Sequence, residues 1–290
     1  AGNGRVEIAL TDGGTLSAAQ VNDLSVAGTA NCYVVSAPGT YVFNARVRGN
    51  GAGEGVGFEP AIEMADGMTA DWLWTDSEGL VSGVALDTTS GDIFLTVGEG
   101  RGNALVALMQ DGKVVWSWHV WVTDAPQTMT YGNGTVFMDR NLGAVGTTAG
   151  GTDAYGMYYQ WGRKDPFSNA TTVYGPEGNT LDMHSWPSCE GYTIDPVWNA
   201  QIGRKSGDYL YNGTVEFTLS HPATYISYAD EKDISNPNQT WLRSDVPGHQ
   251  NDRLWGTYFE KEAVGAATVL LSKSAFDPCP AGYRIPLIAP

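Results

Sequence analysis

The sequence predicts a mostly β protein whose N-terminal part is a β-sandwich. Glycine occurs 37 times and aromatic residues make up 11% of the 290 residues. This composition is typical of short strands joined by tight turns, because glycine supplies the positive φ that many turns need. Short runs of β-branched and aromatic residues also recur between turn-forming residues, at the spacing of a sandwich.

The first strands are predicted from their alternation with turns. Residues 31–47 form two apolar runs around Ala37-Pro38-Gly39, which indicates a strand, a turn and a second strand. Three further strand-length runs follow at residues 72–74, 81–86 and 93–97.

The clearest local prediction is a hairpin centred on Asp111-Gly112. Residues 104–109 and 113–122 flank this dipeptide, which a type I′ turn prefers because both central residues need positive φ. Trp116 and Trp118 share one face of the second strand by its period of two, so they are expected to be buried together. His119 points to the other face, where we expect it to be partly exposed.

A linker interrupts the strand pattern at residues 123–127, where Pro126 follows a long strand. We therefore predict two domains, residues 1–126 and residues 127–290. Asn133-Gly134 is expected to turn the first hairpin of the second domain.

The charge balance and the missing motifs argue against several functions. The net charge of −16 excludes nucleic acid and anionic membrane surfaces as partners, because both need clustered Lys and Arg. No run of about 18 apolar residues predicts a transmembrane helix. The common nucleophile, zinc and phosphate-loop signatures are missing, so we expect neither catalysis nor a cofactor. A structural Ca²⁺ held by acidic loops is left open.

The three cysteines leave three alternatives. All three can be structural thiols, Cys189 and Cys279 can form a disulfide bond, or one of the three can be a nucleophile. Cys32 is expected to form none, because the other two cysteines lie beyond the predicted domain boundary.

Three segments of the second part, residues 137–144, 155–167 and 276–286, resemble a known family. The motifs within these segments that carry the resemblance are Asp139-Arg140-Asn141-Leu142-Gly143, then Tyr158-Tyr159-Gln160-Trp161-Gly162-Arg163-Lys164-Asp165, and finally Asp277-Pro278-Cys279-Pro280-Ala281-Gly282-Tyr283-Arg284-Ile285-Pro286. The chain is similar here to the Fibrobacter major paralogous domain. The run from Asn31 to Tyr41 resembles the fimbrillin-like or immunoglobulin-like module that often precedes it.

The resemblance implies a fold and a setting. The family is common on the surface of gut Bacteroidetes, and its scaffold is similar to C-type lectin folds, so residues 127–290 are expected to form an α+β lectin-like domain with long loops. Members continue beyond the motif ending at Pro286, so this domain is expected to be truncated at its C-terminus. The chain starts at Ala1 without an export signal, which we expect to have been removed. The sugar-binding motifs of C-type lectins, Glu-Pro-Asn and Trp-Asn-Asp, are missing.

The same segments also have structural interpretations. Asp139 and Arg140 are expected to pair with each other, and the turn that begins at Asp277 is expected to be rigid. Tyr158, Tyr159 and Trp161 are expected to be core residues.

These observations predict a surface adhesion or pilus-associated binding protein without catalytic activity. Its partners would be a host or microbial glycan, a surface protein or other pilus subunits, at the cell surface, the outer membrane or a fimbrium. The alternative is a glycan-binding accessory module, or a glycan-processing enzyme of a surface polysaccharide-utilisation system. A ligand site is expected on the loops between Ser168 and Arg253, with three candidate contact residues: Trp186, Trp198 and Trp241.

Overall fold

The computed structural model describes residues 6–9, 17–51, 59–170, 172–176, 180–182, 199–200, 214–226, 241–242, 254–256, 258–261, 267–270 and 273–286. The chain is mostly β with mixed sheets, which confirms the predicted class. None of the described helices is long and apolar enough to span a membrane.

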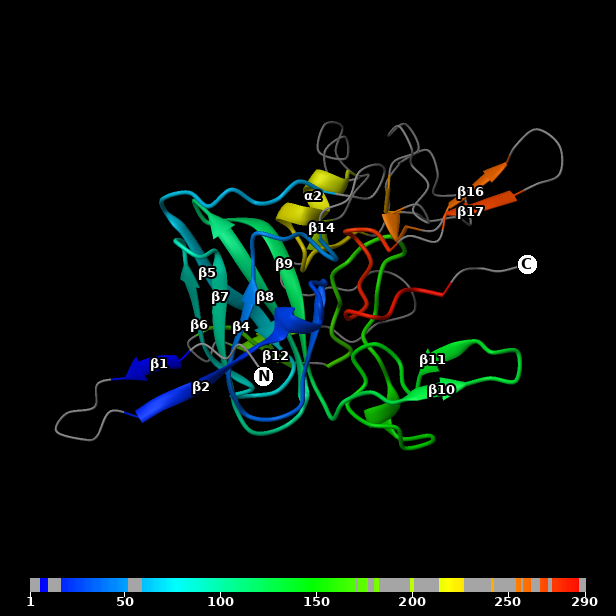
Figure 1. Cartoon of the computed structure of the whole chain (residues 1–290), viewed down its shortest axis with the longest axis horizontal. Coiled ribbons are helices and arrows are strands. Elements are labelled where there is room, and N and C mark those ends of the chain that lie inside the picture. Colours follow the sequence, from blue (N-terminus) through cyan, green and yellow to red (C-terminus); the bar gives the residue numbers. More distant parts are fainter. Residues whose placement is uncertain are drawn as a thin grey trace.

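Two larger sheets dominate the structure (Figure 1). The first contains, in spatial order, β1 (Val6–Ala9), β2 (Ser17–Asp23), β4 (Gly39–Asn44), β7 (Asp92–Val97) and β6 (Val81–Asp87). The second contains β13 (Thr180–Asp182), β12 (Thr172–Tyr174), β5 (Met68–Thr75), β8 (Gly102–Gln110), β9 (Lys113–Val122) and β3 (Cys32–Val35). Two pairs, β2 with β4 and β3 with β9, are parallel and the others are antiparallel.

Smaller elements surround these sheets. They are η1 (Leu24–Ala27), β10 (Thr128–Thr130), β11 (Val136–Met138), η2 (Thr152–Ala154), β14 (Asn199–Ala200), α2 (Val215–Ser220), β15 (Tyr225–Ile226), β16 (Tyr258–Lys261) and β17 (Ala267–Leu270).

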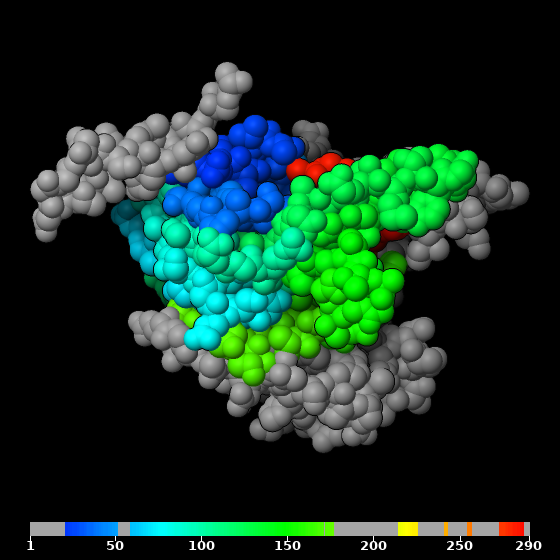
Figure 2. All heavy atoms as spheres, turned by 90° about the horizontal axis from the view of Figure 1, so that it is seen from below, coloured from blue at the N-terminus to red at the C-terminus, as the bar shows by residue number. Residues whose placement is uncertain are grey.

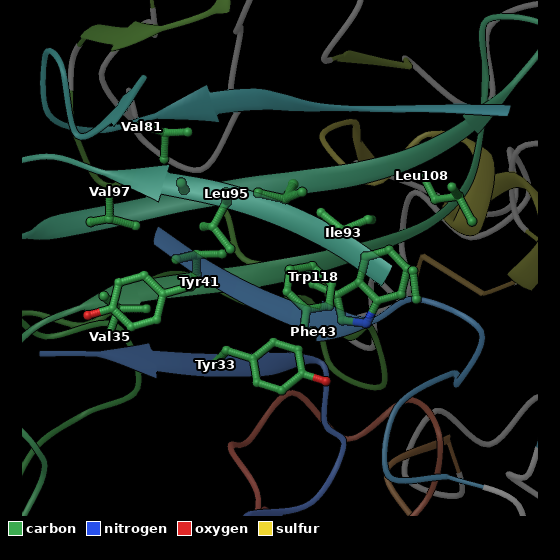
Figure 3. Close-up of a cluster of buried hydrophobic side chains, with 14 of the residues drawn as sticks. Tyr33, Val35, Tyr41, Phe43, Val81, Ile93, Leu95, Val97, Leu108 and Trp118 are labelled. Atoms are coloured by element: carbon green, nitrogen blue, oxygen red, sulfur yellow. The ribbon is translucent and has the colours of Figure 1, made fainter. Parts of the chain in front are cut away.

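Side chains from both sheets meet in one hydrophobic core (Figure 3). Phe43 of β4 lies between aromatic rings of the other sheet, with its centroid 4.8 Å from Tyr33 and 5.2 Å from Trp118. Leu95 and Leu108 are fully buried in the same cluster. Burying each such large apolar side chain contributes roughly 1.5–3 kcal/mol, so this core is the main source of stability.

The hairpin around Asp111-Gly112 is confirmed. Strands β8 and β9 pair antiparallel, with Val106 opposite Trp118 and Leu108 opposite Trp116. Asp111 has φ 51° and Gly112 has φ 74°, as a type I′ turn requires. Both tryptophan rings are fully buried in the same core.

The expectation for His119 is wrong, because both faces of β9 are covered. His119 is buried, and so are Ser117 and Trp121 on the same face. Trp121 Nε1 donates to the carbonyl of Ala144 at 3.0 Å, and Ser117 Oγ donates to Asp165 at 2.6 Å. Residues after the predicted boundary therefore cover the face that we expected to meet solvent.

The two predicted domains are in close contact. Tyr174 of β12 pairs with Thr75 of β5, so a strand from the second part extends a sheet of the first. The finer arrangement, a sandwich followed by a lectin-like domain divided at residue 126, stays a prediction.

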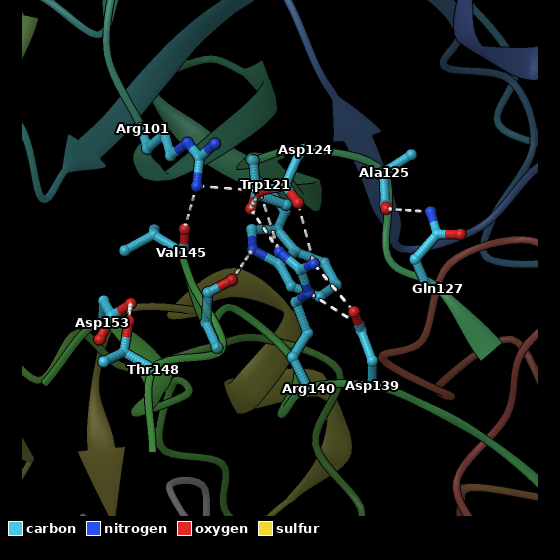
Figure 4. Close-up of polar contacts among 12 residues, drawn as sticks. Arg101, Trp121, Asp124, Ala125, Gln127, Asp139, Arg140, Val145, Thr148 and Asp153 are labelled. Atoms are coloured by element: carbon cyan, nitrogen blue, oxygen red, sulfur yellow. Dashed lines mark hydrogen bonds and ion pairs between the residues drawn. The ribbon is translucent and has the colours of Figure 1, made fainter. Parts of the chain in front are cut away.

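An ion-pair network holds the linker in place (Figure 4). Arg140 binds both Asp139 and Asp124, with N–O distances of 2.9 and 3.0 Å, which confirms the predicted Asp139–Arg140 pair. Arg101 reaches Asp124 at 2.9 Å and the carbonyl of Val145 at 2.8 Å. The hydrogen bonds from Arg140 lower the pKa of Asp124 to about 2.

The C-terminal described segment packs beside β3. The side-chain amide of Asn31 donates to the carbonyls of Ala275 at 2.6 Å and Asp277 at 2.9 Å, and its oxygen accepts from Trp116 Nε1 at 3.0 Å. Cys32 forms an isolated parallel bridge with Pro280. The two hydrogen bonds from Asn31 to Ala275 and Asp277 join sequence positions that lie more than 240 residues apart.

Hydrogen bonds to its own carboxylate hold the turn that begins at Asp277. The buried carboxylate accepts from the backbone N–H of Cys279 at 2.8 Å and of Ile285 at 2.9 Å. Cys32 and Cys279 are both free, which confirms the prediction for Cys32 and leaves Cys279 outside any disulfide bond. Cys189 lies outside the described residues. Burial raises the pKa of both thiols, which keeps them protonated and unreactive.

Candidate functional site

Exposed aromatic rings and buried polar residues are interleaved between residues 155 and 168. Tyr155, Tyr158 and Trp161 are 59%, 47% and 44% exposed. Gln160, Arg163, Lys164 and Asp165, which lie next to them in the sequence, are buried. The core prediction is therefore wrong for Tyr158 and Trp161, because the polar residues of this segment occupy the inner positions.

The backbone at Trp161 is held by two buried indoles. Trp241 Nε1 donates to the carbonyl of Trp161 at 2.7 Å, and Trp255 Nε1 donates to that of Arg163 at 3.1 Å. Gly162 between them has φ 87°, a conformation that side chains other than glycine rarely adopt. The Trp161 ring is therefore presented from a fixed turn.

Arg163 anchors this turn to the segment after α2. One guanidinium nitrogen donates to Gln160 Oε1 at 2.7 Å and to the carbonyl of Thr224 at 2.6 Å. The other donates to the carbonyls of His221 and Pro222 at 3.1 and 3.2 Å. Burial lowers the pKa of Arg163 to about 10, so it stays charged at neutral pH.

Lys164 and Asp165 anchor the other side of the same segment to β9. Lys164 Nζ lies 2.6 Å from Asp165 Oδ1 and donates to Ser117 Oγ at 2.6 Å and to the Ser117 carbonyl at 2.9 Å. It also lies 4.6 Å from the centroid of the Trp116 ring. Two adjacent cations, Arg163 and Lys164, thus point into different parts of the interior and leave Trp161 at the surface.

The ring of Trp161 is supported on one side and open on another. Its centroid lies 4.8 Å from that of the buried Trp255 ring, and the planes are tilted by 46°. An aromatic ring fixed in this way can stack on the apolar face of a sugar or on another ring without losing much side-chain entropy on binding.

The three sequence-predicted contact residues have different outcomes. Trp241 is only 3% exposed and packs with Phe217 and Leu242, so the structure places it in a small core that supports Trp161. Trp186 and Trp198 lie outside the described residues. Sequence reasoning missed Trp161, although its place before Gly162 in a segment rich in aromatic and polar residues was a usable signal.

The chain matches no protein-family model and shows no significant similarity to a curated protein or a solved structure. The likeness of its motifs to the Fibrobacter major paralogous domain therefore stays an interpretation. Among the residues that the structure describes, no group of three or more His, Cys, Asp and Glu side chains is placed to hold a metal ion.

A chain of polar side chains centred on the buried residues His119 and Asn103 lies beside the site. His119 Nε2 is 2.8 Å from Asn103 Oδ1, Asn103 Nδ2 donates to Asp76 at 2.8 Å, and Tyr159 Oη lies 3.3 Å from His119 Nδ1. Burial lowers the pKa of His119 to about 3, so its imidazole is neutral at pH 7.

This histidine predicts an acid-sensitive fold. Since its pKa is lowered on folding from a usual value of about 6.5, its contribution to stability is complete above pH 6.5 and is lost as the pH falls toward 3. The loss is about 1.4 kcal/mol per pH unit. Urea unfolding at pH 7 and pH 4.5 should therefore show a drop about 2–3 kcal/mol larger for the native protein than for His119→Gln. Equal drops would contradict the assignment.

Proposed function

We propose that this chain is an exported, non-catalytic binding protein of the adhesion type, and that Trp161 is a contact for a carbohydrate ligand. The proposal includes a place at the cell surface, the outer membrane or a fimbrium. It also includes the finer fold, an N-terminal sandwich followed by a lectin-like domain.

The observation that carries the proposal is the exposed ring of Trp161 on a rigid turn. A tryptophan offers on the order of 150–250 Å² of surface for burial. Trp161 leaves 44% of its surface exposed to water, and this exposure does not stabilise the fold. Two indole N–H groups and the Arg163 guanidinium hold the turn, so the ring is pre-organised.

The charge of the chain favours a neutral ligand. With a net charge of −16, the protein repels anionic partners at long range. A neutral sugar is unaffected by this field, and its apolar face can cover an exposed indole. Stacking by shape, without bond breaking, is the chemistry that the described residues support.

The test is binding to a panel of neutral and acidic glycans by the intact chain and by Trp161→Ala. We expect a neutral glycan to bind and the substitution to weaken binding about tenfold or more, as for a central aromatic contact. Tyr131→Ala is the matched control, because Tyr131 is 53% exposed, similar to Trp161, and lies on another segment, directly after β10.

Three results would contradict the proposal. One is the lack of binding to every glycan, which would favour a protein partner. The second is binding that Trp161→Ala leaves intact. The third is an equal loss in Tyr131→Ala, which would show that binding depends on surface aromatic content in general. Near-ultraviolet circular dichroism confirms that each variant is folded.

A further inference from the structure

The C-terminal segment, residues 273–286, is fastened to the chain at the start of β3. The side-chain amide of Asn31 donates to two carbonyls of the segment, and Cys32 forms a parallel bridge with Pro280. Figure 2 shows part of the segment, in red, beside blue residues of the N-terminal part. Two stretches that lie far apart along the chain are therefore joined directly.

A second attachment of the segment lies in the loop after β4. Asn50 Nδ2 donates to the carbonyl of Lys273 at 2.7 Å. Gly49 lies so close to the backbone of Ala275 that a Cβ at this position would clash with it. Phe276 is buried in the main hydrophobic core. The start of the segment is thus held on several sides.

Side chains also tie the two ends of the segment to each other. Lys273 Nζ donates to three carbonyls of residues 279–283, at 2.6, 2.7 and 2.8 Å. Asp277 accepts from the N–H of Ile285, eight residues later, at 2.9 Å. Tension applied after Ile285 is therefore transmitted to the start of the segment before the segment is straightened.

The relative direction of the two stretches decides how they resist tension. They run parallel at the bridge between Cys32 and Pro280. When the chain is pulled before Asn31 and after Ile285, the two parallel stretches are drawn in opposite directions along their length. Their contacts then bear the load together, in shear, whereas contacts loaded from one end break one after another. Sharing the load raises the barrier that governs unfolding under force.

The strands nearest the N-terminus continue this geometry. β2 pairs parallel with β4, from Val21 opposite Thr40 to Asp23 opposite Val42, so tension on the chain before β2 loads this pair in shear as well. β1 and β2 are antiparallel and are loaded from their open end. The β1–β2 pair should therefore separate first, at low force.

We propose that Asn31, Cys32, Asn50 and residues 273–286 form a mechanical clamp that resists tension along the chain. A protein that is attached to a surface and holds a ligand carries such tension. The biological use of the clamp thus rests on the proposed function, whereas its mechanical strength is a property of the fold alone.

The test is single-molecule force spectroscopy of the intact chain, held at its two ends under constant force. The native protein should unfold slowly at forces that already separate β1 from β2. Asn31→Ala removes both side-chain hydrogen bonds to the segment, so this variant should unfold about tenfold faster at the same force.

Asn103→Ala is the matched control. Asn103 and Asn31 are each 1% exposed, and Asn103 likewise donates to two oxygens, of Asp76 and Gly143, and contacts a ring nitrogen, of His119. Its loss should lower the stability in urea by a similar amount. These partners lie between the two halves of the clamp along the chain, where tension arrives only after the clamp breaks. Asn103→Ala should therefore unfold under force at the rate of the native protein.

A second pulling direction tests the geometry without a substitution in the clamp. Ala37 is exposed in the turn after β3, so a handle can be attached there through an introduced azide side chain. Pulling from this position and from the C-terminal end loads β3 and the segment from the same end, and their contacts break in succession. Unfolding should then be faster than in end-to-end pulling at the same force.

Faster unfolding of Asn31→Ala than of Asn103→Ala, together with faster unfolding from residue 37, supports the clamp. Equal rates in the two variants, or equal rates in the two pulling directions, overturn it. If Asn31→Ala fails to fold, the two pulling directions decide. None of these measurements uses a glycan, so a failure of the clamp and a failure of the role proposed for Trp161 are distinguishable.

Discussion

Replacing Asp165 by alanine is expected to lower the free energy of unfolding by about 3–5 kcal/mol, because it leaves a buried ammonium without its carboxylate. Lys164 is buried, and Asp165 Oδ1, at 2.6 Å, is the carboxylate oxygen bound to it. Burial already lowers the pKa of Lys164 and Asp165 opposes that shift. The stability lost in Asp165→Ala should therefore decrease as the pH rises toward about 10, because Lys164 then loses its positive charge in the folded and in the unfolded chain.

Urea unfolding of Asp165→Ala and of the double variant Lys164→Met/Asp165→Ala distinguishes charge from packing. If the unpaired charge causes the loss, the double variant recovers most of the stability, since apolar replacement of a buried ion pair is often neutral. A double variant as unstable as Asp165→Ala would show that the loss comes from packing against β9.

Replacing Trp118 by alanine is expected to cost about 3–5 kcal/mol, because it removes the largest kind of side chain from the centre of the core. The ring is fully buried and contacts Phe43 from the opposite sheet. Thermal or urea unfolding measures the loss. A change below about 1 kcal/mol would contradict the account of this core.

Phenylalanine substitutions give a sharper comparison between Trp118 and its neighbour Trp116. The indole N–H of Trp118 has no hydrogen-bond partner among the described residues, so Trp118→Phe loses ring volume alone. Trp116→Phe also leaves Asn31 Oδ1 without its donor, which adds about 1–3 kcal/mol. Equal losses of stability in the two variants would contradict a role for the hydrogen bonds of the Asn31 side chain in joining the start of β3 to the C-terminal segment.

Local sequence signals predicted local structure well. Asp111-Gly112 specifies positive φ at two successive residues, and the alternation after it places Trp116 and Trp118 in one core. The prediction failed for His119 because burial of the second face depends on residues 144–165, which no local pattern connects to β9. The pairing of β12 with β5 is non-local in the same way.

The candidate site shows a similar division. The loop-rich stretch between Ser168 and Arg253 indicated that its tryptophans are available for binding, and the structure brings one of them, Trp241, against the backbone of Trp161. Which of the two rings is exposed depends on Arg163 and Lys164, whose long side chains turn inward to carbonyl and carboxylate oxygens. Charged residues usually indicate a solvent-exposed face, so the sequence favoured Arg163 and Lys164 at the surface and Trp161 in the core.

Oxidative footprinting of the intact chain, with and without a glycan selected from the panel, measures directly whether Trp161 contacts the ligand. Peptide mass mapping then measures oxidation at each tryptophan. We expect Trp161 to be oxidised readily in the free protein and protected when the glycan is bound, while Tyr131, directly after β10, reacts equally in both states. A Trp161 ring that resists oxidation without ligand, or that stays equally reactive when the glycan is bound, would contradict this role of Trp161.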